Sequence, residues 1–376
     1  MKFFVRKALH VLAAGIAVSL PACVQEVSGC TAAIVSARAS ASGRPLLWKN
    51  RDTSAIDNKV EYIAAAHPGE LAFVALFNAS DRDCLEAWAG MNSAGFAVMN
   101  TASYNLNDGK VPQKDMDREG YVMTLALKHC RSVDDFESLL SSLPRPMGVE
   151  ANFGVMDASG AGAFFETGND FFTRYDLADA ADGVLVRTNY SHSGRPGEGF
   201  GQIRERNALE LLRPYMGHAS LSPSVFTEEL SCSFYHSLHG RDMLAPDAEW
   251  IVDQDFIPRF TTTASVVIEG VVPAERIMED SGRDYVMWTA LGYPPCAEVV
   301  PVWCDPQGVD PELRGLEEDG TSAMCNRAKA RKAEVFCAPD GNASRYIYIP
   351  ALCGDKGYLS RFRRLNYETY AKLRRH

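Results

Sequence analysis

The 376-residue sequence lacks several features that would indicate particular classes of protein. Its N-terminal apolar stretch, Ala8 to Ala22, has 15 residues and is too short to span a bilayer comfortably. Basic residues are in deficit, with 38 Lys and Arg against 48 Asp and Glu, so a nucleic-acid partner is not expected. No two cysteines have the C-x-x-C spacing of a zinc site. We therefore expect neither a metal nor a cofactor.

Low-complexity sequence, internal repeats and a linker between domains are also missing. The hydrophobic content of 46% is enough for a large buried core. We predict that residues 1–29 are a leader that is removed and that residues 30–376 form one catalytic domain. Residues 300–376, which contain Cys304, Cys325, Cys337 and Cys353, are interpreted as a C-terminal extension of the same domain.

The N-terminus has the pattern of an export signal. Lys2, Arg6 and Lys7 precede the apolar stretch and form a positive region. This pattern predicts a periplasmic or extracellular protein. Setting Cys23 and Cys30 aside leaves eight of the 10 cysteines, an even number in an oxidising compartment, so disulfides are plausible, although their pairing cannot be read from the sequence.

Two sites of leader cleavage remain open. Leu20-Pro21-Ala22-Cys23 resembles a lipoprotein box, which would place a lipid on Cys23 and give the only expected membrane attachment. Val27-Ser28-Gly29 supplies small residues directly before Cys30. We favour removal of residues 1–29, by a signal peptidase or by the chain itself, directly or after a first cut at Cys23.

The hydrophobic pattern predicts strands and helices in separate blocks. The strand-like runs are 30–36, 46–48, 71–77, 94–101, 153–157, 163–166, 184–187 and 265–270. The predicted helices are 117–130, 132–143, 202–212 and 222–239, the second with Ser132 and Asp135 as a capping pair. Without regular alternation of strand and helix, this order favours a layered α+β fold over a doubly wound parallel sheet.

The residues around Cys30 are the most informative feature. Cys30 begins a strand, and Lys49-Asn50-Arg51-Asp52 ends the strand that would pair with it in a hairpin, so the two segments would lie side by side. A free α-amine on Cys30 would have a pKa of about 8 and would accept the thiol proton without a histidine. Asp52 would hold that amine, and Lys49 or Arg51 would favour the thiolate.

These residues belong to a series of motifs that resembles the N-terminal nucleophile hydrolases. It looks closest to the isopenicillin-N acyltransferase and carcinine hydrolase-like group, with bile salt hydrolase and penicillin V acylase as more distant relatives. The motifs, which extend over residues 30 to about 300, are Gly29-Cys30-Thr31, Gly43 to Asp52, Trp88 to Phe96, Ala151-Asn152-Phe153, Phe165 to Gly168, Arg187 to Tyr190 and Thr261 to Ser265.

The resemblance implies a four-layer αββα sandwich and cleavage, or transfer, at a non-peptide or terminal amide bond of a small N-acyl compound. It implies that Cys30 is the nucleophile, with its own amine as the base, and that Asp52 is the carboxylate beside it. Lys49 stands where bile salt hydrolases have an arginine, a role that Arg51 could fill instead. Asn189 matches an oxyanion-hole asparagine.

Two further positions are ambiguous. Asn92 and Asn100 can both be aligned with a second oxyanion donor. We favour Asn100, since it comes at the end of a strand, and interpret Asn92 as a turn residue. Arg204 matches a catalytic-site arginine loosely and could equally form a surface salt bridge on its helix.

Other functions remain open at this stage. A dipeptidase is one alternative, because the turn at 39–44 followed by Asn50-Arg51-Asp52 also resembles that branch of the superfamily. An inactive amidase fold that serves as a binding lipoprotein anchored at Cys23 is another. His192, His236 and His239 lack a carboxylate at a telling spacing, so a histidine-dependent or metal site is not favoured.

Overall fold

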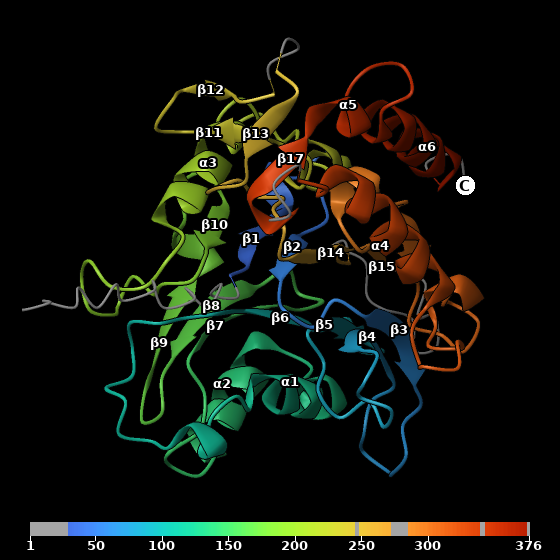
Figure 1. The fold of residues 1–376 in the computed structure, drawn as a ribbon. Coiled ribbons are helices and arrows are strands. Elements are labelled where there is room, and N and C mark those ends of the chain that lie inside the picture. The colour runs from blue at the N-terminus through green and yellow to red at the C-terminus, as the bar shows by residue number, and fades with distance from the viewer. Residues whose placement is uncertain (1–28, 245–247, 272–284, 339–342, 374–376) are drawn as a thin grey trace, which may run out of the picture.

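The computed structural model describes residues 29–244, 248–271, 285–338 and 343–373 (Figure 1). The predicted export signal and Cys23 lie outside this part of the chain. The described helices include none that is long and apolar enough to cross a membrane.

Two antiparallel sheets form the centre of the molecule. The first has the strand order β10 (Val184–Arg187), β1 (Thr31–Val35), β2 (Leu46–Asp52), β14 (Thr262–Glu269), β15 (Val286–Leu291) and β16 (Val300–Val302). The second runs in sequence order through β3 (Asn58–Ile63), β4 (Phe73–Asn78), β5 (Ala89–Asn92), β6 (Ala97–Ala102), β7 (Ala151–Met156), β8 (Gly162–Thr167) and β9 (Phe172–Asp176). Two further sheets have two strands each: β11 (Tyr235–His236) pairs with β12 (Arg241–Asp242), and β13 (Trp250–Val252) pairs with β17 (Tyr346–Tyr348).

Helices cover the outer faces of both sheets (Figure 1). Beneath the seven-stranded sheet lie α1 (Glu119–His129) and α2 (Val133–Ser142). On the side of the six-stranded sheet lie α3 (Gln202–Leu212), α4 (Ala323–Val335), α5 (Ile349–Leu352) and α6 (Tyr358–Leu373). The layers are therefore helix, sheet, sheet, helix, and the predicted αββα sandwich is confirmed.

Four apolar cores occur among the described residues, and β2 contributes side chains to two of them. Leu47 points between the sheets, where it packs with residues such as Val74 and Phe164 of the second sheet. Its neighbour Trp48 points outward, against Ala208 of α3. Because successive side chains alternate between the faces, a strand covered on both sides is apolar throughout. The end of β2 is the exception, since residues 49–52 are polar and still buried.

The structure confirms most of the predicted elements within a few residues. The interval 132–143 appears as α2, and Ser132 and Asp135 form a reciprocal capping box. The helix predicted over 222–239 is wrong: only a six-residue π-helical turn forms, at Val225–Leu230. The chain then turns because the Ser231 hydroxyl contacts both Trp48 and Ser265, a tertiary interaction that local sequence does not reveal.

The structure contains no disulfide among the described cysteines, contrary to the expectation from their even number. All nine cysteines in the described part of the chain are free, and most are buried. Cys296 and Cys325, for example, lie in different cores. The late cysteines therefore act as small apolar side chains, as buried free cysteines commonly do.

We predict that Phe136→Ala lowers the free energy of unfolding by about 3–5 kcal/mol, because it opens a cavity in a closely packed aromatic cluster. Phe136 is fully buried and contacts Phe153 and Phe165 edge to face, with ring centroids 5.6 and 5.2 Å away. Denaturant unfolding measures the change. Phe171→Ala is the control, since Phe171 is 46% exposed and its loss should cost less than about 0.5 kcal/mol. Equal effects of the two substitutions would contradict this account of the core.

Candidate active site

Cys30 lies at the open end of the first hairpin, where β1 begins and β2 ends. Thr31 of β1 pairs with Asn50 of β2, so the preceding residue comes beside the end of β2. The Cys30 sulfur is 3.8 Å from the backbone oxygen of Asp52, and the residue is only 7% exposed. The predicted juxtaposition of these two segments is therefore present.

A cavity of about 460 Å³ opens beside this sulfur. Five of the seven predicted site residues line it: Cys30, Lys49, Arg51, Asp52 and Asn100. Its size suits a small molecule rather than a polypeptide chain.

Lys49 is held on the cavity wall by two acceptors. Its ammonium donates to the side-chain oxygen of Asn100 and to the backbone oxygen of Trp88, each at 2.8 Å. Burial lowers the pKa of Lys49 to about 8, although the nearby Cys30 favours the charged form. Lys49 is thus a cation close to the sulfur that gives up its proton more readily than an exposed lysine.

Arg51 is a second cation on the same wall. It donates to the side-chain oxygens of Asn58 and Asn78, the latter at 2.7 Å, and its guanidinium lies 5.1 Å from the Trp88 ring centre. Burial lowers its pKa to about 10, and Cys30 again favours the charged form. Lys49 and Arg51 therefore both act electrostatically on Cys30, and the geometry does not make one a substitute for the other.

Asp52 is buried, and both of its carboxylate oxygens accept hydrogen bonds. One carboxylate oxygen accepts from the Arg259 guanidinium at 2.7 Å, and the other accepts from Thr262 at 2.7 Å and Asn50 at 3.1 Å. Burial lowers the pKa of Arg259, but the adjacent carboxylate of Asp52 outweighs this effect. The pKa of Arg259 is therefore raised. Sequence reasoning missed Arg259, which lies two residues before the Thr261 to Ser265 motif.

Lys332 of α4 contacts the segment before β14 that carries Arg259. It donates to the backbone oxygens of Phe260 and Thr262, the latter at 3.1 Å, and lies over the rings of Phe260, Tyr293 and Phe336. Burial lowers the pKa of Lys332 to about 8. A residue of the C-terminal region thus supports the segment that binds Asp52.

Arg204 is buried, with 1% of its surface exposed, and it binds the residues around the nucleophile. Its guanidinium donates to the backbone oxygens of Gly29 at 3.2 Å and Cys30 at 2.7 Å, and to the Asn189 side chain at 2.7 Å. The alternative of a surface salt bridge is therefore wrong.

The three asparagines differ in what they contact. Asn92 donates to two backbone oxygens of the α1 region and accepts from the amides of Ala94 and Phe96, which is the turn role expected for it. Asn189 donates to the backbone oxygen of Ala102 at 2.8 Å and does not line the cavity. Asn100 does line it.

Three carboxylates, which we call the acidic wall, form another part of the cavity lining: Asp117, Glu119 and Glu150. Glu119, in the first turn of α1, is 8% exposed and accepts from the Glu150 backbone amide at 2.8 Å. Burial, together with Asp117 and Glu150, raises the pKa of Glu119 to about 7. Sequence reasoning missed this wall, since no local motif joins these positions.

The histidines lie apart from the cavity. His192 pairs with Glu205 at 2.8 Å, and the rings of His236 and His239 are 4.9 Å apart. No group of three or more metal-binding side chains occurs among the residues that the structure describes.

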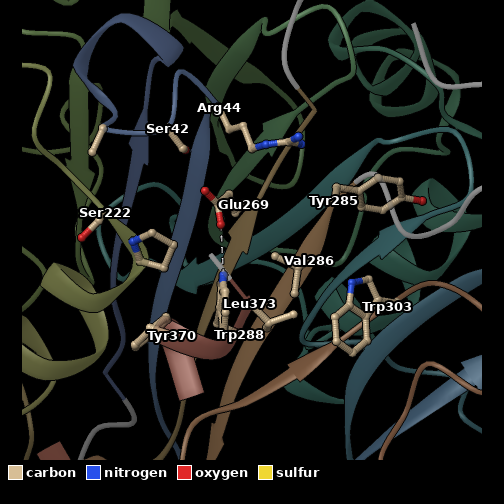
Figure 2. A pocket seen from close by; sticks show the side chains of 12 residues that line it. Ser42, Arg44, Ser222, Glu269, Tyr285, Val286, Trp288, Trp303, Tyr370 and Leu373 are labelled. Atoms are coloured by element: carbon tan, nitrogen blue, oxygen red, sulfur yellow. Dashed lines mark hydrogen bonds between the residues drawn. The ribbon is translucent and has the colours of Figure 1, made fainter. Parts of the chain in front are cut away.

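A second pocket, of about 610 Å³, lies at the opposite end of the β1–β2 hairpin (Figure 2). Glu269 stands at its centre and accepts from the Trp288 indole at 3.2 Å, with Arg44 on the rim. None of the predicted site residues lines this pocket. The predicted site residues therefore gather at the Cys30 cavity.

Comparison with known proteins gives only distant similarities. No protein-family model and no curated protein matches the chain. A Caenorhabditis elegans N-acylethanolamine-hydrolyzing acid amidase ortholog aligns over 67% of this chain and 98% of its own, with 14% identity and a TM-score of 0.43. The conjugated bile acid hydrolase of Clostridium perfringens aligns over 73% and 92%, with 12% identity and a TM-score of 0.42.

The penicillin V acylase of Agrobacterium tumefaciens aligns over 73% of this chain and 86% of its own, with 12% identity and a TM-score of 0.37. Two of these proteins are of the kinds that the sequence motifs resemble more distantly. At such low identities and TM-scores, the similarities assign neither a family nor an activity to this chain. The closer resemblance to the isopenicillin-N acyltransferase group stays a prediction.

We predict that Glu119→Gln changes how stability depends on pH. The pKa of Glu119 is about 7 when folded and about 4.3 when unfolded, so between these values the folded protein holds a proton that the unfolded chain releases. Wild-type stability should therefore fall as pH rises from 5 to 8, relative to the variant, by up to roughly 3 kcal/mol. Unfolding at a series of pH values measures this. Parallel curves for the two proteins would contradict the assignment.

Proposed function

We propose that the chain is an exported cysteine amidohydrolase or acyltransferase of the N-terminal nucleophile type, acting on a small N-acyl compound. The observation that carries the proposal is the position of Cys30, whose thiol lines a small-molecule cavity beside Asp52 and two buried cations. Removal of residues 1–29 would turn the Cys30 nitrogen from an amide into an amine. An amine at this position can accept the thiol proton, which an amide nitrogen cannot.

The proposed reaction has two steps. The Cys30 sulfur attacks the carbonyl carbon of the substrate, the thiol proton passes to the α-amine, and that proton then leaves with the departing amine. Water next attacks the resulting thioester, which yields an acid and restores the thiol. An amine in place of water would give a new amide, and so an acyl transfer.

Negative charge develops on the carbonyl oxygen during each attack, and donors must be in place for it. Because Lys49 holds the side-chain oxygen of Asn100, the side-chain nitrogen of Asn100 is the atom left to donate. Asn189 is the second proposed donor. It lies beside Gly29, since a Cβ atom at that glycine would come 2.7 Å from the Asn189 side-chain oxygen. Departure of Gly29 would therefore open space next to Asn189.

The same residues support removal of the leader by the chain itself. The Gly29 oxygen accepts from Arg204 at 3.2 Å and from Arg259 at 3.0 Å. If the Cys30 sulfur attacks the Gly29 carbonyl carbon, these two guanidinium groups already contact the oxygen that becomes negative. As the Gly29–Cys30 bond breaks, the Cys30 nitrogen becomes an amine and takes the thiol proton, which leaves the leader as a thioester on the Cys30 sulfur. Water then cleaves this thioester, releasing the leader as a carboxylate and restoring the thiol.

We predict that Cys30→Ala abolishes hydrolysis of N-acyl amides, a loss of roughly 10³-fold or more, because no thioester can form. Mass spectrometry of the quenched wild-type reaction should place the acyl group on a chain that begins at Cys30. Cys337→Ala is the control, since it removes an exposed thiol elsewhere. An active wild-type enzyme that still carries Gly29 would refute the mechanism.

We predict that Gly29→Val retards leader removal. A Cβ atom at Gly29 would come 2.3 Å from the Arg259 guanidinium, so the valine should displace the carbonyl from its two donors. Intact mass of full-length protein refolded without other proteins measures the rate, which should not depend on concentration. Gly43→Val is the control, because a Cβ there meets nothing within 4 Å, although its positive φ of 70° adds local strain. Cleavage of the wild type only when a signal peptidase is added would exclude self-cleavage.

A further inference from the structure

The acidic wall of Asp117, Glu119 and Glu150 forms no ion pair with any cation in the part of the chain that the structure describes. Neutral groups donate hydrogen bonds to these carboxylates. They include the backbone amides of Glu150, Leu106 and Asn107 and the side chain of Gln113.

Such an arrangement carries an electrostatic cost. Burying a carboxylate is unfavourable without a counter-charge, and neighbouring carboxylates increase the cost. Glu119 meets both conditions, because it is 92% buried by surface area and has two carboxylates near it. Lys49 attracts Glu119 electrostatically but forms no ion pair with it, since the Lys49 ammonium donates to Asn100 and Trp88 instead.

We propose that the substrate carries a positively charged group, such as an ammonium, which binds Asp117, Glu119 and Glu150 while its amide lies against Cys30. This inference rests on the proposed function and specifies its substrate class. The acidic wall and the nucleophile line one cavity of about 460 Å³, so a single small molecule can reach both. The protein as a whole, with a net charge of −10, also attracts cations.

Matched amide substrates test the proposal on the mature enzyme. In each pair one member ends in a trimethylammonium group and the other in the neutral tert-butyl group of similar shape. One pair carries this group on the acyl side and another on the amine side, which shows which half of the substrate meets the acidic wall. We expect kcat/KM to be at least about tenfold higher for the cationic member of one pair.

Glu119→Gln should remove most of this preference, because it lowers kcat/KM for the cationic member more than for the neutral member. Glutamine keeps the acceptor for the Glu150 amide while removing the charge. The control is Glu86→Gln, because Glu86 packs against Gly120 of α1 and does not line the cavity. If Glu119→Gln does not fold, Asp117→Asn replaces it, since Asp117 is exposed and should lower the preference by roughly threefold.

The outcomes separate the two hypotheses. Equal hydrolysis of both members in each pair, a preference for the neutral member, or an equal loss of preference in Glu86→Gln would overturn the inference and leave the amidase proposal intact. A mature wild-type enzyme that cleaves no amide in either pair or in a broad N-acyl panel would overturn the proposed function itself.

Discussion

The buried carboxylate of Asp52 is the constraint on which the site depends. A charge with no exposed surface needs a counter-charge and a full set of donors, and Arg259, Thr262 and Asn50 supply them. These partners come from β2, from β14 and from the loop before β14. Because these three partners surround one carboxylate, they hold the end of β2 in place. The start of β1, where Cys30 lies, pairs with that end and is held with it.

The layered fold explains why so much charge can be buried at this place. Both faces of the central sheets are covered, so the strands are apolar along most of their length. At the end of β2 the pattern changes to four polar residues that are still buried. Each cation there is held by amide oxygens or an aromatic ring rather than by a carboxylate. Its charge consequently remains available to whatever enters the cavity.

Local sequence predicted the parts of the structure that local interactions determine. The hairpin around Cys30, the helix beginning after Ser132 and the turn at Asn92 each depend on neighbouring residues. Arg259 and the acidic wall could not be predicted in this way, because they join segments about 30 to 200 residues apart and no spacing rule connects them. The helix expected over 222–239 failed for the same reason, since Ser231 is fixed by contacts with distant strands.

The contact between Lys332 and the loop before β14 has a consequence for how short the chain can be made. Lys332 belongs to α4, well beyond the last strand of either central sheet, yet it holds the backbone oxygens of Phe260 and Thr262. A truncation after β16 would keep every strand of both sheets and every residue that lines the cavity. It would still remove the Lys332 contacts to the segment that carries Arg259. The smallest unit that retains every one of these contacts therefore extends through α4.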